Sequence, residues 1–161
     1  MLNTHSSKTG GLAVTENYMQ QALELARQAA SEGEVPVGAV IVHDGKVIAQ
    51  GRNRREHEKN AIYHAEMEAI DKACAALGGW RLESCTLYVT LEPCPMCAGA
   101  IINARIPIVY YGARDSKAGS CGSVVNLFEL PYNHKPTVVG GILEETCGEI
   151  LRDFFQKLRN K

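Results

Sequence analysis

Residues 86–100 read Thr-Leu-Tyr-Val-Thr-Leu-Glu-Pro-Cys-Pro-Met-Cys-Ala-Gly-Ala, and this stretch carries the strongest structural signal in the chain. Its first part, residues 86–90, is rich in β-branched and aromatic side chains, which predicts a strand. Pro93 stands where a proline opens a helix, so residues 94–103 are expected to be helical. The stretch therefore predicts a strand that leads directly into a helix, with two cysteines where the two elements meet.

Further elements are predicted on both sides of this stretch. Residues 37–42 and 46–51 form a hairpin, because the intervening Asp44-Gly45 suits a type I′ turn. Apolar side chains at helical spacing and β-rich runs predict the remaining elements. These are helices at 16–31, 64–77 and 144–158, a short helix near 124–127, and strands at 108–112 and 137–139. This alternation implies an α/β fold, with a mixed sheet and helices packed on both of its faces.

Composition indicates one globular domain. The chain has 161 residues, of which 45% are hydrophobic and 22% are charged, as in average globular proteins. Residues 1–15 are polar and are expected to be a flexible lead-in to a domain over 16–161. They lack the apolar core of a secretory signal, and no run approaches the ~20 apolar residues of a membrane span. We therefore expect a cytoplasmic protein with no membrane partner.

The net charge of −1 argues against a nonspecific nucleic-acid coat, because phosphate neutralisation would favour a basic chain. DNA is not expected as a partner, whereas local basic patches leave binding to a folded RNA open. Such patches are Arg52, Arg54 and Arg55, and a group near the C-terminus made of Arg152, Lys157, Arg159 and Lys161. Charges at such positions are usually a solvated face, so the support is weak.

Three residues have the spacing of metal ligands. Cys94 and Cys97 are three apart, which makes them neighbours in the first turn of a helix. The positive potential of a helix N-terminus favours their thiolate forms. Together with His64 they make the ligand set of a tetrahedral zinc site with one open position, which is typical of catalytic sites. Among the other cysteines, Cys121 is the one candidate for a fourth ligand.

Glu66 separates a catalytic from a structural zinc site. A carboxylate that lies near zinc without binding it can move protons to and from the metal's water. Taken alone, a Cys-x-x-Cys pair with a distant histidine is about as often structural or redox, and His-x-Glu is more often a solvated helix start. Together with Pro93 they match the zinc deaminase signature His-x-Glu…Pro-Cys-x-x-Cys. The combined pattern favours catalysis.

Longer segments extend the match. The chain resembles the bacterial tRNA-specific adenosine deaminases over nearly its whole length from about Glu16. The resemblance rests on residues 35–40, 64–66, 87–100, 111–115, 117–119, 133–134 and 153–155. It implies a three-layer α/β/α fold of the cytidine-deaminase-like type with a five-stranded sheet, a homodimer, and one Zn²⁺ per subunit. One departure from many relatives is the short basic tail after Phe155.

The resemblance also implies a reaction, the deamination of adenosine to inosine at wobble position 34 of a tRNA. An arginine tRNA with an ACG anticodon is the expected substrate, bound through its anticodon stem-loop. Zinc-activated water would attack C6 of a flipped adenine while Glu66 moves the protons. The implied roles are zinc binding by His64, Cys94 and Cys97, and substrate contact by Asn53, Val35, Pro93, Asp115 and Phe155.

Simpler explanations stand beside four of these contacts. Asn53 can stabilise a loop and Val35 can pack in the core. Asp115 suits a turn, and Phe155 suits the apolar face of a helix. Two other functions also stay open, a deaminase for free bases or nucleosides such as guanine or cytidine, and a zinc-stabilised RNA-binding module without catalysis.

Overall fold

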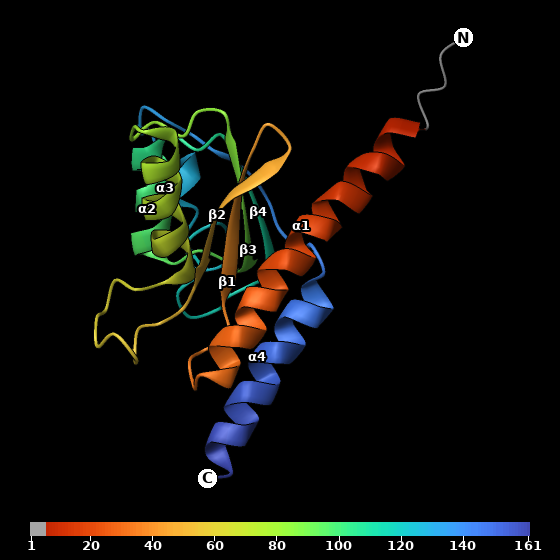
Figure 1. The fold of residues 1–161 in the computed structure, drawn as a ribbon, viewed down its shortest axis with the longest axis vertical. Coiled ribbons are helices and arrows are strands. Elements are labelled where there is room, and N and C mark those ends of the chain that lie inside the picture. Colours follow the sequence, from red (N-terminus) through yellow and green to blue (C-terminus); the bar gives the residue numbers. More distant parts are fainter. Residues whose placement is uncertain (1–5) are drawn as a thin grey trace.

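The computed structural model describes residues 6–161, which form a five-stranded sheet of order β2-β1-β3-β4-β5 (Figure 1). Strand β1 is antiparallel to β2 and β3, whereas β3–β4 and β4–β5 are parallel pairs. The predicted mixed five-stranded sheet is confirmed. Its strands are β1 (Gly38–His43), β2 (Lys46–Arg52), β3 (Cys85–Leu91), β4 (Ile108–Ala113) and β5 (Thr137–Val139).

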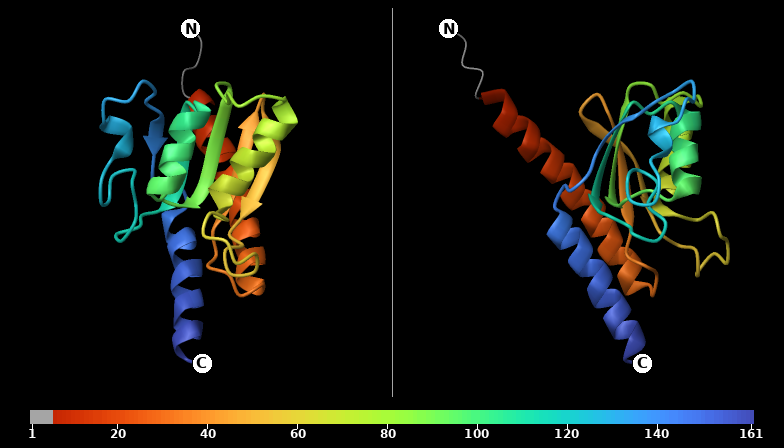
Figure 2. Two further views of the ribbon diagram at one scale, coloured as in Figure 1. Left: turned by 90° about the vertical axis from the view of Figure 1, so that its left-hand side faces the viewer. Right: turned by 180° about the vertical axis from the view of Figure 1, so that it is seen from behind.

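Helices cover both faces of this sheet, which confirms the three-layer α/β/α fold. Figures 1 and 2 show α2 and α3 together on one face, and α1 and α4 together on the other. Each face has its own apolar core, the first centred on Leu87 and Ile101 and the second on Met19 and Tyr88. The helices are α1 (Ser6–Ser31), α2 (Ala65–Leu77), α3 (Pro95–Ala104) and α4 (Glu144–Arg159), with a 3₁₀ turn η1 (Leu127–Glu129).

Helix α1 begins earlier than expected. Of the predicted flexible lead-in at 1–15, residues 6–15 have helical backbone and residues 1–5 lie outside the described part of the chain. Buried Met19 and Leu23 anchor the helix on the sheet, and an anchored helix extends at little cost because only nucleation is expensive. The extension projects past the sheet (Figure 1), which leaves Leu12 and Val14 more than half exposed.

Two other boundaries differ from the sequence prediction. Pro95, rather than Pro93, occupies the start of α3, and Cys94 is the N-cap residue in front of it. The short helix expected near 124–127 lies at Leu127–Glu129, because the side chain of Asn126 accepts a hydrogen bond from the Phe128 amide and caps it there. The hairpin is as expected, with positive φ at both turn residues, 50° at Asp44 and 72° at Gly45.

None of the helices described over 6–161 is long and apolar enough to cross a membrane.

The sheet packs closely against its helices, and two glycines permit this close packing. A Cβ atom on Gly38 would collide with the backbone of α1 at Ala22 and Ala26. A Cβ atom on Gly51, in the neighbouring strand, would collide with the backbone of α2 at Ala65 and Ala69. The second approach sets the distance of α2 from the sheet.

We expect Gly51→Ala to lower the free energy of unfolding by about 1–3 kcal/mol, because α2 must move off the sheet to accept the added methyl group. Urea denaturation measures the change. Gly79→Ala is the matched control, since nothing lies within 4 Å of a Cβ atom there. Equal destabilisation by the two substitutions would contradict the close-packing explanation.

Candidate metal centre and active site

Two helix N-termini meet beside the end of the sheet. His64 is the N-cap residue of α2, with φ −82° and ψ 157°, and Cys94 is the N-cap residue of α3, with φ −75° and ψ 174°. These extended conformations turn the two side chains away from the helical direction. Cys97 follows in the first turn of α3. Two positive helix ends therefore share one site, which favours anionic thiolates there.

The three side chains have the geometry of a metal site. Nδ1 of His64 lies 3.6 Å from Sγ of Cys94 and 3.6 Å from Sγ of Cys97, and the three ligand atoms lie within 4.8 Å of one another. A tetrahedral zinc ion with Zn–S of ~2.3 Å and Zn–N of ~2.0 Å would separate sulfur from nitrogen by roughly 3.5 Å. The donors and their spacing thus fit zinc.

Cys121 does not join this group. Its side chain is buried, with 5% exposed, but the cluster of potential ligands among the described residues contains only His64, Cys94 and Cys97. The backbone amide of Cys121 instead donates to Glu92. Three protein ligands leave a tetrahedral ion one position for water or substrate, as in catalytic zinc sites.

The two thiols differ in acidity. The pKa of Cys94 is lowered to about 4, chiefly by the hydrogen bond from the Cys97 thiol and further by His64. The same hydrogen bond and burial raise the pKa of Cys97. The hydrogen bond with Cys94 also raises the pKa of His64. The cluster therefore holds one thiolate readily and keeps the second thiol protonated until a cation replaces that proton.

Glu66 lies in the first turn of α2 and is buried, with 4% of its surface exposed. Burial raises its pKa to about 7, against the opposing effect of its own backbone amide. A carboxyl group with a pKa near neutrality can both accept and release a proton at working pH. Glu66 lines a cavity together with His64 and Cys94.

This cavity has a volume of about 200 Å³, below the ~300–1,000 Å³ of typical drug-sized sites and suited to a single flat ring. Three predicted substrate contacts line it, namely Val35, Asn53 and Asp115. Pro93 is not among its lining residues. Pro93 is buried, and its carbonyl accepts a hydrogen bond from the Ser120 amide.

Asn53 both lines the cavity and stabilises a loop. Its side-chain amide donates to the Val35 carbonyl at 3.2 Å, and its side-chain oxygen accepts from the Arg55 amide at 3.2 Å. An asparagine side chain offers two donor hydrogens and two acceptor lone pairs, so one of each remains for a ligand. The Asn53 side chain therefore does stabilise the loop, and it still has one donor and one acceptor that could contact a base.

Two buried glutamates were not identified from the sequence. Glu34 has 1% of its surface exposed and accepts hydrogen bonds from the amides of Glu56 and His57. Glu92, with 2% exposed, accepts hydrogen bonds from the loop after β4. Burial opposes ionisation of Glu92, but those bonds, led by that from Ser123, lower its pKa overall. The only signal in the sequence was their position, with Glu34 directly before Val-Pro and Glu92 directly before Pro-Cys.

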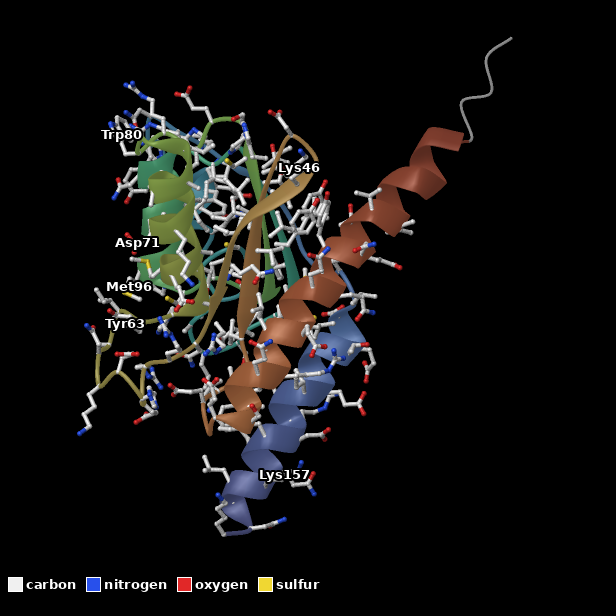
Figure 3. The ribbon with its side chains drawn as sticks, in the orientation of Figure 1. Lys46, Tyr63, Asp71, Trp80, Met96 and Lys157 are labelled. Carbon is white, nitrogen blue, oxygen red and sulfur yellow. The ribbon has the colours of Figure 1, made fainter. Side chains whose placement is uncertain are left out.

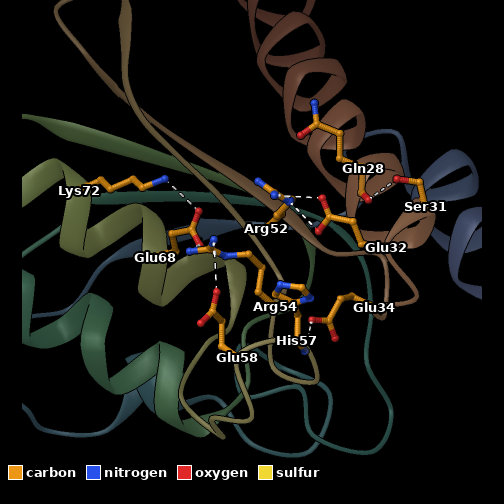
Figure 4. A network of polar contacts seen from close by, with 10 residues as sticks. All are labelled: Gln28, Ser31, Glu32, Glu34, Arg52, Arg54, His57, Glu58, Glu68 and Lys72. Carbon is orange, nitrogen blue, oxygen red and sulfur yellow. Dashed lines mark hydrogen bonds and ion pairs between the residues drawn. The ribbon is translucent and has the colours of Figure 1, made fainter.

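Of the three arginines around Asn53, one faces the site. Figure 4 shows Arg52 paired with Glu32, at 3.0 Å, and Arg54 directed at Glu68, at 2.8 Å. The Arg54 pair ties the loop after β2 to helix α2, whose Glu68 is nearly buried. Only Arg55 lines the cavity. Two of the arginines expected to form an RNA patch thus hold the loop in place.

A groove of about 820 Å³ adjoins the cavity and shares four lining residues with it, Val35, Arg55, Leu91 and Asp115. Helix α4 forms one side, where Phe155 is 40% exposed. Phe155 therefore lies in the groove and outside the cavity. The lining holds a single acid, Asp115, and five basic residues, which are Arg55, Arg114, Lys117, Arg152 and Arg159.

The fold and this site define a deaminase of the cytidine-deaminase-like class. The profile of the MafB19-like deaminase family matches residues 14–159. The tRNA-specific adenosine deaminase of Bacillus subtilis (strain 168) is 54% identical over 147 residues, 91% of each chain. That of Agrobacterium fabrum is 48% identical over 92% of this chain and 98% of its own. The chain belongs to the MafB19-like deaminases and, within them, to the tRNA-specific adenosine deaminase family.

Solved structures agree with this assignment. A structure from a study of A-to-I editing by tRNA:A34 deaminases superposes with a TM-score of 0.82 at 48% identity, covering 84% of this chain and 99% of its own. The guanine deaminase of Nitrosomonas europaea superposes with a TM-score of 0.73 at 26% identity, covering 86% and 83%. The fold is thus shared by deaminases of different substrates.

Zinc content tests the ligand assignment. We expect Cys94→Ala and Cys97→Ala to bind zinc far more weakly, because two ligands cannot complete a tetrahedral site. Cys121→Ala should retain one zinc per chain. Metal analysis of the purified variants measures this, and acidification should release the metal from wild type as protons compete for the ligands. Loss of zinc from Cys121→Ala would contradict a three-ligand site.

Proposed function

We propose that the protein deaminates adenosine to inosine at position 34 of a tRNA, with an arginine tRNA of ACG anticodon as substrate. The observation that carries this proposal is a single cavity in which Glu66 lies beside His64 and Cys94 and which adjoins a basic groove. The cavity accounts for the chemistry and the groove for the nucleic acid. The printed names of the relatives support the choice of tRNA.

Each residue of the cavity has a role in the proposed reaction. His64, Cys94 and Cys97 hold one zinc ion, which when bound supplies a water of lowered pKa as the nucleophile. Glu66 takes a proton from the attacking water and delivers it to the ring nitrogen; it then takes a second proton, from the hydroxyl group added at C6, and delivers that one to the amine, which departs as ammonia. Its buried position and pKa of about 7 suit both directions of transfer.

The adenine must leave its stack to enter a cavity of this size. Asn53 uses its remaining donor and acceptor to hold the base against the wall formed by Val35. The Asp115 side chain already accepts from the amides of Lys117 and Ala118 through Oδ1. Its other oxygen remains available for a ribose hydroxyl, a contact that favours RNA over DNA. Phe155 provides a stacking surface in the groove.

A free purine base is the second candidate substrate. The fold likeness to the guanine deaminase of Nitrosomonas europaea favours it. The groove argues against it, because a free base needs neither five basic side chains nor an exposed phenyl ring beside the cavity. The homodimer stays a prediction from the resemblance, and the cytoplasmic location stays a prediction from the sequence composition.

Glu66→Gln should abolish inosine formation in an arginine tRNA transcript with an ACG anticodon, with a loss of roughly 10²–10⁴-fold or more. An amide of nearly the same shape cannot carry the proton, so zinc content and folding should be retained. Sequencing of the treated transcript detects inosine. Full activity of Glu66→Gln would favour a binding module, and ammonia release from guanine alone would favour a free-base enzyme.

The groove has its own test. Lys117→Ala and Arg159→Ala should each raise KM for the tRNA and reduce the slope of log Kd against log salt by about 1. Lys46→Ala is the matched control, because Lys46 lies on the hairpin at the end of the molecule opposite Lys157 of α4 (Figure 3). An unchanged salt slope in both groove variants would place the RNA elsewhere.

A further inference from the structure

Glu92 lies at the junction between the metal segment and the groove. It follows β3 and stands two residues before Cys94, and its amide donates to the Ala113 carbonyl at the end of β4. Its side chain lines the cavity with only 2% exposed. An acidic side chain in this position would ordinarily be a candidate for catalysis.

The hydrogen bonds of Glu92 exclude a direct chemical role. Oε1 accepts from the Asp115 amide at 3.2 Å and from the Ser123 hydroxyl. Oε2 accepts from the amides of Cys121, at 3.0 Å, and Ser123, at 3.1 Å. A carboxylate has about four acceptor positions, so none remains for substrate or for a proton in transit.

All four bonds hold one loop, the segment 114–123 that follows β4. This loop carries Asp115, which lines both the cavity and the groove, and Lys117, which lines the groove. The loop packs so closely on the carboxylate that a Cβ atom on Gly119 would collide with Glu92 and with the Asp115 carbonyl. The position of this loop's part of the groove, including Arg114 and Lys117, relative to the cavity therefore depends on Glu92.

We propose that Glu92 is a positioning residue that sets the RNA-contacting loop against the cavity, and so controls binding of the RNA while leaving the chemical step unchanged. The inference rests on the proposed function. The expected effect of substituting Glu92 on RNA affinity is opposite to the effect that electrostatics alone would have. Removal of a negative charge beside a polyanion should tighten binding, whereas loss of the loop's anchor should weaken it.

Single-turnover kinetics on an anticodon stem-loop RNA with adenosine at position 34 separate the two effects. For Glu92→Gln, whose amide group presents donors to donors, we expect the half-saturating enzyme concentration to rise by about three- to tenfold. The saturating rate and the zinc content should match wild type. Glu129→Gln is the matched control, because Glu129 is an exposed acid further along the same connection. It should leave the half-saturating concentration unchanged or lower it.

Gly119→Ala provides a second variant with the net charge unchanged, and decides the matter if Glu92→Gln does not fold or hold zinc. It should show the same rise in half-saturating concentration, whereas Gly79→Ala should not. An unchanged or lower half-saturating concentration in folded, zinc-loaded Glu92→Gln overturns the inference, as does a fall in the saturating rate alone. If wild type with zinc converts no RNA, the proposed function fails and the inference falls with it.

Discussion

Helix α2 packs so closely against the sheet that its N-terminus meets the N-terminus of α3. The geometry of the site depends on this packing. Gly51 lets α2 approach strand β2 closely, and α3 begins at Pro95, shortly after β3 ends at Leu91. Each N-cap residue leaves the helical direction, so His64 and Cys94 turn toward the same point. The helix ends also supply the positive potential that favours thiolates there. The positions of the proposed metal ligands, of Glu66 and of the cavity all follow from this one arrangement.

The direction of the strands explains why the remaining contacts gather at the same edge. Strands β2, β3 and β4 all run toward that edge, and β1 starts from it. Asn53, Glu92 and Asp115 follow the ends of the first three, while Val35 precedes the fourth. Carboxyl ends of strands are where open α/β sheets place their ligands. Proposed substrate contacts that are far apart in the chain therefore become neighbours around one cavity.

Buried carboxylates hold the loops that border the cavity. Glu34 accepts hydrogen bonds from backbone amides of the loop after β2, and Glu92 accepts them from the loop after β4. Glu68 also holds the loop after β2, through its ion pair with Arg54. Irregular backbone has no ladder to satisfy its amides, so a buried acceptor fixes its shape. Some of the acidic residues that bring the net charge to −1 are thus buried, whereas five basic residues line the groove. Net charge alone therefore does not describe the surface beside the cavity.

Most helices and strands, and the proposed metal ligands, were predictable from the amino-acid sequence, because local periodicity, turn residues and the His-x-Glu and Cys-x-x-Cys spacings act within a few residues. The family resemblance predicted Asn53 and Asp115 as substrate contacts, and both line the cavity. The folded structure was needed to show that Arg52 and Arg54 form internal ion pairs, that Cys121 lies outside the group of potential metal ligands, and that Phe155 lines the groove. It also revealed Glu34 and Glu92. Each of these outcomes depends on which distant side chain or amide lies opposite, and only packing of the whole chain specifies that partner.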